Sequence, residues 1–211
     1  MINLIINADD FGMSNMFNDC ILELLSKRKI TSTTVMVNRI SPVQNKRVLE
    51  LKKLKETSDI SVGLHVEFTY DKHLEQVRDQ YHRFISLFNS PPSHLDIHKE
   101  HLHGKYHEIV AKFCKDYHLG FRNHGQIFDG VATTAKKYFY GSIADFNPID
   151  IWLNDLEDEK VYEMVFHPGV YDPNCYSSLN EERRRDIQYI DKIYHNLQDY
   201  NVRLVSFNHL D

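Results

Sequence analysis

The chain has 211 residues, of which 42% are hydrophobic and 26% are charged, and its formal net charge is -5. These values are typical of one soluble domain, and the acidic balance argues against an extended surface for nucleic acid. No apolar run approaches the roughly 20 residues that cross a bilayer, so we expect no membrane span. Cys20, Cys114 and Cys175 are widely spaced, which favours a reduced, cytoplasmic protein.

Short runs rich in β-branched and aromatic residues alternate with amphipathic stretches, a pattern that predicts a parallel α/β fold. In chain order, we predict strands at Leu4–Asn7, Thr33–Val37, Ser61–His65, Ser93–Ile97, Gly120–Arg122, Val161–Phe166 and Arg203–Phe207. The predicted helices are Asn15–Lys27, Pro42–Thr57, Lys72–Phe88, Tyr106–Tyr117, Pro148–Leu156 and Leu179–Tyr200. No repeat or linker-like segment interrupts this order, so residues 1–211 are predicted to form one domain.

Two segments need a separate interpretation. The stretch from Gly125 to Gly141 is the least regular part of the chain, and we predict a long loop over one end of the fold. The densest basic run, Arg183-Arg184-Arg185, falls within the last predicted helix, and we interpret it as a solvated face. Nothing in the sequence indicates an oligomeric state.

The first predicted strand leads into two adjacent carboxylates, Asp9 and Asp10, in the segment Asn7-Ala8-Asp9-Asp10-Phe11-Gly12. Ionised carboxylates are costly to bury unless a cation or hydrogen-bond donors compensate them. One of the two could bind a metal ion while the other acts on bound water. The alternative is a solvated turn, because Asp and Gly favour turns and Ser14 could cap the next helix.

Histidines follow or end several of the later strands. His65 ends the third predicted strand, and the fourth continues through His94, Asp96 and His98, whose alternation places them on one face. His167 follows the sixth strand and precedes a Pro-Gly turn. Each histidine alone could be structural, but sites form where the carboxyl ends of parallel strands meet. The sequence therefore predicts one polar cluster at that end of the fold.

This cluster has the chemistry of a metal site. Imidazoles with a carboxylate suit zinc, iron, cobalt, nickel or manganese, and a more hydrated site could take magnesium. Asp96 could orient His98 through its other ring nitrogen, or it could be an ordinary surface residue. The aromatic rings of Phe139, Tyr140 and Tyr171 could stack on sugar faces, or they could pack in the interior.

Together these motifs resemble those of the YdjC-like carbohydrate deacetylases, a family that includes chito-oligosaccharide deacetylases. The opening segment, residues 7–12, matches the family motif letter for letter. The motifs that follow in the family's order are Gly63-Leu64-His65, Pro92-Ser93-His94-Leu95-Asp96-Ile97-His98, Phe139-Tyr140-Gly141 and His167-Pro168-Gly169. The resemblance covers nearly the whole chain, and it implies a distorted, partly open βα (TIM-like) barrel with about seven mainly parallel strands.

The resemblance also implies roles for individual residues. Asp10, His65 and His98 would bind a divalent metal ion, which is most often Mg²⁺ in the family, although Zn²⁺ or another transition ion is possible. Asp9 would be the catalytic acid and base, and His167 would line the pocket opposite it. The implied activity is a metal-dependent hydrolysis that removes the N-acetyl group of an N-acetylated sugar and releases acetate.

The chain departs from the family pattern in two places. Lys99-Glu100 stands between His98 and His101, so we assign no role to His101 or His103. The loop after His65 is shorter than in most family members, which should leave the pocket more open. The resemblance therefore does not imply the chito-oligosaccharide substrate that is usual in the family.

Two other functions remain as alternatives. A phosphoesterase would use paired metal ions and basic residues that neutralise phosphate, and Arg122 is the one candidate anchor near the cluster. A catalytically inactive relative that binds carbohydrate or metal would keep Asp10, His65 and His98, but it would not need Asp9.

Overall fold

The computed structural model describes residues 1–122, 125–135, 138–141 and 152–210. Within them the sheet is built around β1 (Ile2–Phe11), which pairs in parallel with β2 (Ser32–Val35), β7 (Val161–Phe166) and β8 (Val202–Leu204). One edge of β1 pairs with β7, and the other pairs first with β8 and then with β2. Its apolar residues are buried, as expected for a strand of a parallel sheet that is covered on both faces.

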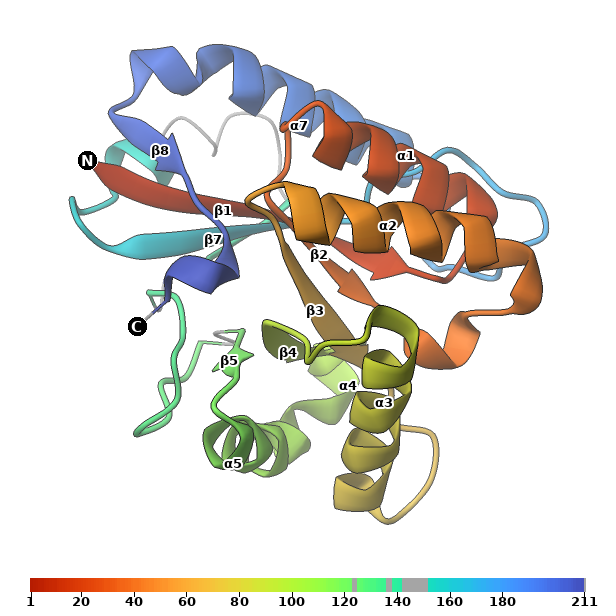
Figure 1. The fold of residues 1–211 in the computed structure, drawn as a ribbon. Coiled ribbons are helices and arrows are strands. Elements are labelled where there is room, and N and C mark those ends of the chain that lie inside the picture. The colour runs from red at the N-terminus through yellow and green to blue at the C-terminus, as the bar shows by residue number, and fades with distance from the viewer. Residues whose placement is uncertain (123–124, 136–137, 142–151, 211) are drawn as a thin grey trace.

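The sheet runs in the order β5-β4-β3-β2-β1-β7-β6, with β8 beside β1. The other strands are β3 (Ser61–Val66), β4 (His94–Ile97), β5 (Gly120–Phe121) and β6 (Tyr138–Tyr140), and every pair is parallel. The sheet curls as a partly open barrel (Figure 1). The predicted fold class, a distorted TIM-like α/β barrel, is confirmed.

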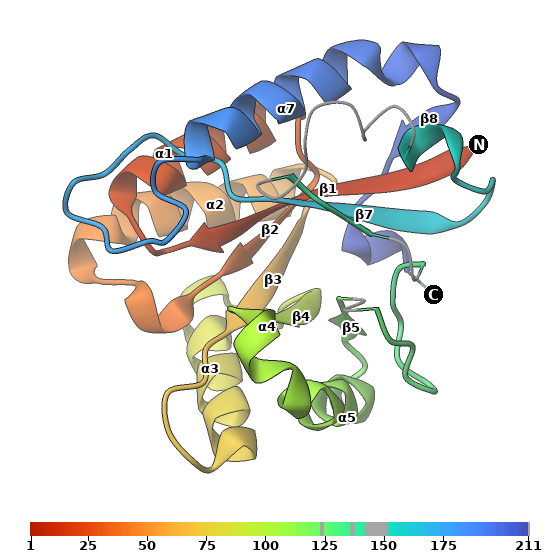
Figure 2. The ribbon, with the colours of Figure 1, turned by 180° about the vertical axis from the view of Figure 1, so that it is seen from behind.

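Helices cover the outside of the curled sheet. α1 (Asn15–Ser26), α2 (Asn45–Thr57) and α7 (Arg183–Asn196) lie along one side, while α3 (His73–Phe88), the short α4 (Glu100–His103) and α5 (His107–Tyr117) lie towards the other (Figures 1 and 2). α1 begins where Ser14 accepts a hydrogen bond from the Met16 N–H, which satisfies a free donor of the first turn. Its apolar stripe, which includes Phe17 and Ile21, is buried against the sheet.

Three predictions about local structure need correction. The stretch from Gly125 to Gly141 is not all loop, because it contains β6 beside β7. Residues Glu100–His103, for which we predicted neither a strand nor a helix, form the helix α4. The last helix begins at Arg183 rather than Leu179. The predicted helix Pro148–Leu156 lies partly outside the described residues.

β5 and β6, at the two ends of the strand order, do not pair with each other. Backbone hydrogen bonds of the segment between them close this side of the barrel instead. The Phe121 N–H donates to the Ala132 carbonyl at 2.9 Å, and the Ala135 N–H donates to the Val161 carbonyl at 2.7 Å. The segment from residues 131 to 135 therefore connects the β5 side of the sheet to β7. This arrangement lets side chains from β5 and β7 meet inside the barrel.

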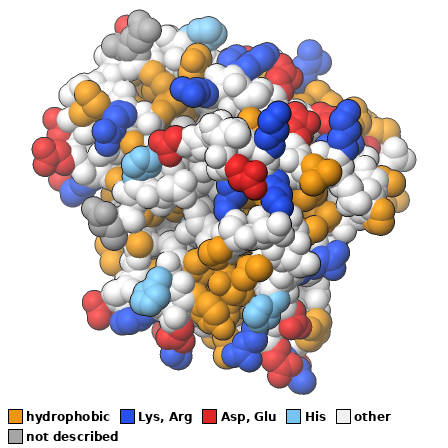
Figure 3. Space-filling model, viewed as in Figure 1, with side chains coloured by type: hydrophobic (Ala, Val, Ile, Leu, Met, Phe, Trp, Pro, Cys, Tyr) orange, Lys and Arg blue, Asp and Glu red, His pale blue; other side chains and the backbone are white. Residues whose placement is uncertain are grey.

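Surface charges of both signs are interspersed over the face seen in Figure 3. Among the described residues, no helix has both the length and the apolar character needed to cross a membrane.

The amino-terminal end of the barrel interior is filled by His94, whose position depends on Gly63. The His94 ring is buried and stacks on Phe207 with ring centroids 3.5 Å apart. A Cβ atom at Gly63 would lie only 2.5 Å from His94 Cε1. Glycine on β3 is therefore what leaves room for the ring.

We predict that Gly63→Ala lowers the free energy of unfolding by about 1–3 kcal/mol, because the buried ring cannot move aside without disturbing Phe207. Urea denaturation would measure the loss. Gly104→Ala is the control, since its nearest atom would be at 3.4 Å. Equal stabilities of the two variants would contradict this account of the packing.

Candidate active site

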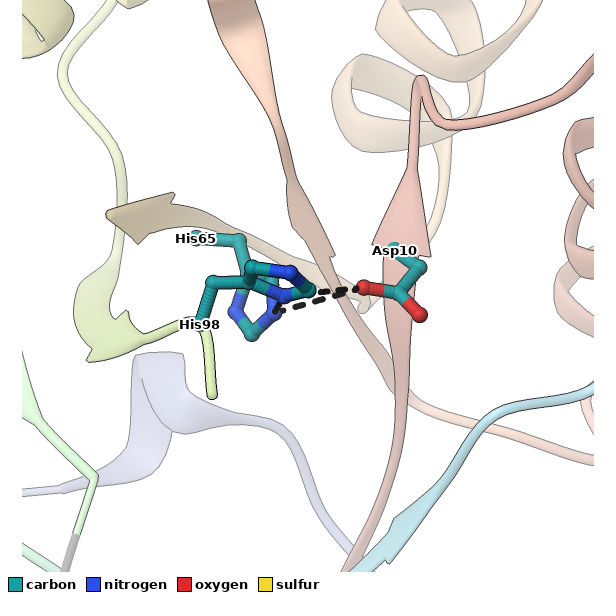
Figure 4. A group of neighbouring side chains, drawn as sticks. All are labelled: Asp10, His65 and His98. Atoms are coloured by element: carbon teal, nitrogen blue, oxygen red, sulfur yellow. Dashed lines mark hydrogen bonds and ion pairs between the residues drawn. The ribbon is translucent and has the colours of Figure 1, made fainter. Parts of the chain in front are cut away.

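Three possible metal ligands meet at the carboxyl ends of β1, β3 and β4 (Figure 4). Asp10 Oδ1 lies 3.4 Å from His65 Nε2 and 3.4 Å from His98 Nδ1. The two imidazole nitrogens are 3.0 Å apart. Asp10 and His65 are buried and His98 is partly exposed. The structure thus brings together the three residues that the family resemblance implies as ligands.

A distortion at the end of β1 directs both adjacent carboxylates towards one pocket. Neighbouring side chains of a regular strand point to opposite faces. Here the register with β2 shifts between Ala8 and Phe11, and Asp10 has a φ of 70°. As a result, Asp9 and Asp10 both line the same pocket.

Asp96 orients His65 and not His98, which corrects the role that we expected for it. Asp96 Oδ1 lies 2.7 Å from His65 Nδ1, and both side chains are buried. This contact leaves His65 Nε2 to face Asp10 and His98. Burial alone would lower the pKa of His65, but the nearby Asp96 and Asp9 carboxylates outweigh it and hold this pKa well above its ordinary value.

The group formed by Asp10, His65 and His98 fits a divalent metal ion. One ligand atom from each residue lies within 4.8 Å of the others. Asp10 Oδ1 is buried and has no hydrogen-bond partner, although a buried carboxylate oxygen requires compensation. Burial would raise the pKa of Asp10, yet His65, His98 and Arg183 hold it well below its ordinary value. Asp10 is therefore held ionised, which is the form of a carboxylate that binds a metal ion.

Asp9 belongs to a different set of contacts, centred on Arg122. The Arg122 guanidinium donates to both Asp9 oxygens, at 2.8 and 2.7 Å. The Asn7 amide and the Thr34 hydroxyl donate to Asp9 Oδ1 at 2.6 and 2.9 Å. Burial would raise the pKa of Asp9, but Arg122 outweighs it and lowers this pKa below its ordinary value. Asp9 is held ionised and fixed in orientation.

Arg122 compensates two further carboxylates, which explains a residue whose role the sequence left open. It forms an ion pair with Asp96, and its Nε donates to Glu163 Oε1 at 2.8 Å. All four side chains are buried. Burial raises the pKa of Glu163 to about 7, against the opposing effect of Arg122. Sequence reasoning missed Glu163, although a charged residue inside the apolar strand β7 was a visible signal.

Arg183 contradicts our interpretation of the basic run as a solvated face. Its side chain is only 1% exposed. It donates to Asp10 Oδ2 at 2.5 Å and lies over the Phe17 ring, 3.9 Å from the centroid. Helical periodicity could not reveal this role, because Arg183 occupies the first turn of α7 and faces the end of the barrel. Arg184 and Arg185 are exposed.

His167 lies beside Asp9, with Nε2 at 3.7 Å from Asp9 Oδ2. Its backbone N–H donates to Asp186 Oδ2 at 2.7 Å, and this bond anchors the start of the loop after β7. The His167 side chain is partly exposed and lines the pocket. It therefore lines the pocket, as the family resemblance implies, and is a neighbour of Asp9.

The pocket has a volume of about 530 Å³. Asp9, Asp10, His65, His98 and His167 all line it, so every predicted site residue opens into one cavity. This size falls within the range of small-molecule sites.

Of the residues that we left without a role, His101 lines the pocket, whereas His103 lies near the Phe68 and Tyr106 rings instead. Tyr140 also lines the pocket. Phe139 does not match the suggestion of sugar stacking, because it is buried near Trp152 and Phe166.

The chain is similar to known proteins along nearly its whole length. A family model described as YdjC-like protein matches residues 3–79 and 74–202. A carbohydrate deacetylase of Clostridium beijerinckii is 26% identical over 97% of this chain and 98% of its own length. A chitooligosaccharide deacetylase of Klebsiella pneumoniae is 26% identical over 84% of this chain and 88% of its own.

Solved structures share the fold at low sequence identity. A proposed cellobiose-phosphate cleavage protein of Enterococcus faecalis V583 superimposes with a TM-score of 0.74 and 20% identity, over 98% of this chain and 97% of that chain. A family 4 acetyl xylan esterase from Clostridium thermocellum, in complex with a cobalt ion, gives a TM-score of 0.56 and 12% identity, over 98% of this chain and 88% of that chain.

We predict that Arg122→Met lowers the free energy of unfolding by about 3–5 kcal/mol, because it leaves buried carboxylates without their cation. The loss should be greater at pH 8 than at pH 5. The pKa of Glu163 is about 7 with Arg122 in place, and it rises further when this cation is removed. As the pH increases, the folded variant therefore retains a proton that the unfolded chain and the folded wild type release, and its stability falls relative to that of the wild type. Denaturation at both pH values, in the presence of a chelator, would measure this difference.

Arg47→Met is the matched control, because Arg47 also makes two hydrogen bonds to one carboxylate, that of Asp19, but does so at the surface. Exposed pairs contribute about 0–1 kcal/mol. A loss for Arg122→Met no larger than that of the control would show that the buried pairing does not stabilise the fold.

Proposed function

Because the chain belongs to the YdjC-like protein family, we propose that it is a carbohydrate deacetylase, which removes the N-acetyl group from an N-acetylated sugar with the help of a divalent metal ion. The observation that carries this proposal is the pairing of two kinds of group in one pocket. Asp10, His65 and His98 form a ligand set. Asp9 lies next to this set and is held by Arg122 instead. The names of the two curated relatives support the same substrate class.

Asp10 Oδ1, His65 Nε2 and His98 Nδ1 would hold the ion. When bound, a divalent cation polarises the acetamido carbonyl and lowers the pKa of coordinated water. Two imidazole nitrogens with one carboxylate oxygen suit zinc or a similar transition ion better than magnesium, which prefers oxygen ligands.

The residues of the chain would handle the protons. Asp9 would accept a proton from the attacking water, as a general base. Arg122 would hold the Asp9 carboxylate in place throughout, since it bonds to both oxygens. As the amide C–N bond breaks, the departing amine needs a proton, and either Asp9 or the neighbouring His167 would donate it. The products would be acetate and the free amino sugar.

The same geometry weighs against the two alternatives. Asp9, His65 and Asp96 form a second group of possible metal ligands, which could hold a second ion. However, the Arg122 guanidinium already compensates Asp9 and Asp96, which does not favour a phosphoesterase with paired metals. A binding protein without turnover would have no use for Asp9 held ionised beside the ligand set.

We expect Asp9→Asn to lower kcat for acetate release by about 10²–10⁴-fold, because a general base contributes that much, while bound metal is retained. Asp10→Asn should instead lose metal. Activity would be measured on N-acetylglucosamine and chito-oligosaccharides after metal loading, and metal content by elemental analysis. Asp116→Asn is the control, since Asp116 pairs with Lys112 on the surface of α5.

Each alternative has its own outcome in this experiment. Undiminished acetate release by Asp9→Asn would refute the assignment of the base. Metal binding without acetate release from a panel of N-acetylated sugars would favour the binding protein, and hydrolysis of phosphate monoesters alone would favour the phosphoesterase.

Asp96→Asn should weaken metal binding by about 10–100-fold, because Asp96 fixes the His65 ring from behind. Competition with a chromophoric chelator would measure the affinity. Thr34→Val is a useful comparison, since the Thr34 hydroxyl contacts Asp96 and Asp9 but no metal ligand. An unchanged affinity in Asp96→Asn would show that His65 does not need this support.

A further inference from the structure

Arg183 is a buried cation to which the reaction described above assigns no part. Enclosing a guanidinium is costly unless its surroundings compensate the charge. Its Nη2 donates to Asp10 Oδ2 at 2.5 Å and to Ser177 Oγ at 3.0 Å. The guanidinium carbon lies over the Phe17 ring, 3.9 Å from its centroid. The contacts come from the end of β1, from α1 and from the loop after β7, so they hold Arg183 in one orientation.

These contacts divide the two oxygens of Asp10 between different partners. Oδ2 is engaged by Arg183, whereas Oδ1 faces His65 Nε2 and His98 Nδ1 at 3.4 Å each. The φ of 70° at Asp10 fixes the direction of the side chain further. Of the two Asp10 oxygens, only Oδ1 therefore faces the two histidines.

We propose that Arg183 is a positioning residue that makes Asp10 a one-oxygen metal ligand and thereby selects small transition ions over larger ones. This inference rests on the metal centre of the proposed function. Carboxylates often bind Ca²⁺ with both oxygens at 2.3–2.6 Å, while zinc takes four ligands at about 2.0–2.2 Å. When Arg183 engages Oδ2, Asp10 offers only one oxygen to the ion, which suits zinc and disfavours Ca²⁺.

Arg183 also changes the charge of the ligand set. Its positive charge offsets the negative charge of Asp10 at hydrogen-bond distance, and the two imidazoles are neutral when they bind metal. The ligands would then cancel little of the charge of a bound divalent ion. More of that charge remains available to the substrate carbonyl and to bound water, which is the property that amide hydrolysis needs.

The test compares Arg183→Met and Arg183→Lys with Arg184→Met, an exposed arginine at the next position of the same helix. Affinities for Zn²⁺ and Ca²⁺ would be measured by chelator competition. We expect the ratio of Ca²⁺ to Zn²⁺ affinity to rise by about tenfold or more in Arg183→Met, because both Asp10 oxygens become available. Arg183→Lys should fall between this variant and the wild type, and Arg184→Met should match the wild type.

A crystal structure of the zinc-loaded wild type gives the second readout and does not depend on how the variants fold. Asp10 should contact zinc through Oδ1 alone, with Oδ2 still on Arg183. Coordination by both oxygens, displacement of Arg183, or equal metal selectivity in Arg183→Met and Arg184→Met would overturn the inference. Such a result could coexist with normal acetate release, so it is distinguishable from failure of the proposed function. A wild-type protein that binds neither ion would overturn both.

Discussion

The candidate site depends on one buried cation, the guanidinium of Arg122. It faces carboxylates from β1, β4 and β7. Without it, Asp9, Asp96 and Glu163 would be like charges enclosed together, and each would favour its protonated form. Because β4 and β7 are not neighbours in the sheet, Arg122 also joins strands across the barrel interior. Ion pairs thus stabilise the end of the barrel that carries the pocket, whereas stacked rings fill the end around His94.

Two arginines give two adjacent carboxylates different properties. Arg122 occupies both oxygens of Asp9, whereas Arg183 occupies one oxygen of Asp10 and leaves the other towards the histidines. Asp9 is accordingly fixed as an ion beside the ligand set, and Asp10 is available to join it. Asp96 and Glu163 compete with Asp9 for Arg122, and their negative charges limit how far the arginine weakens Asp9 as a base.

The parts of this arrangement that were predictable are those with a local signature. The alternation of β-rich and amphipathic runs predicted the α/β fold. The apolar run before Asp9, the alternation through Asp96 and His98 and the rule for strand ends predicted a polar cluster, and the family resemblance implied which of its residues are ligands. The bulge that turns Asp9 and Asp10 to one side has no such signature, because it depends on pairing with β2. The order of the motifs predicted a pocket, but it could not reveal the compensating charges.

Those compensating charges come from residues distant in sequence. Arg122 lies 113 positions after Asp9, and Arg183 lies 173 positions after Asp10. Helical periodicity placed Arg183 on an outer face, since the pattern describes the helix as a whole and not its first turn. The strand β6 was missed because its three residues lie in the irregular stretch from Gly125 to Gly141, which we interpreted as one long loop.

The depth of the two arginines has a consequence for how the pocket responds to its medium. Mobile ions screen charges at the surface, with a Debye length of about 8 Å at physiological salt, but they screen enclosed pairs much less. Arg122 and Arg183 are 2% and 1% exposed, so the electric field that they impose on Asp9 and Asp10 belongs to the protein and varies little with ionic strength. Arg39 at the pocket rim, with its side chain 56% exposed, is the kind of group through which dissolved salt would act instead.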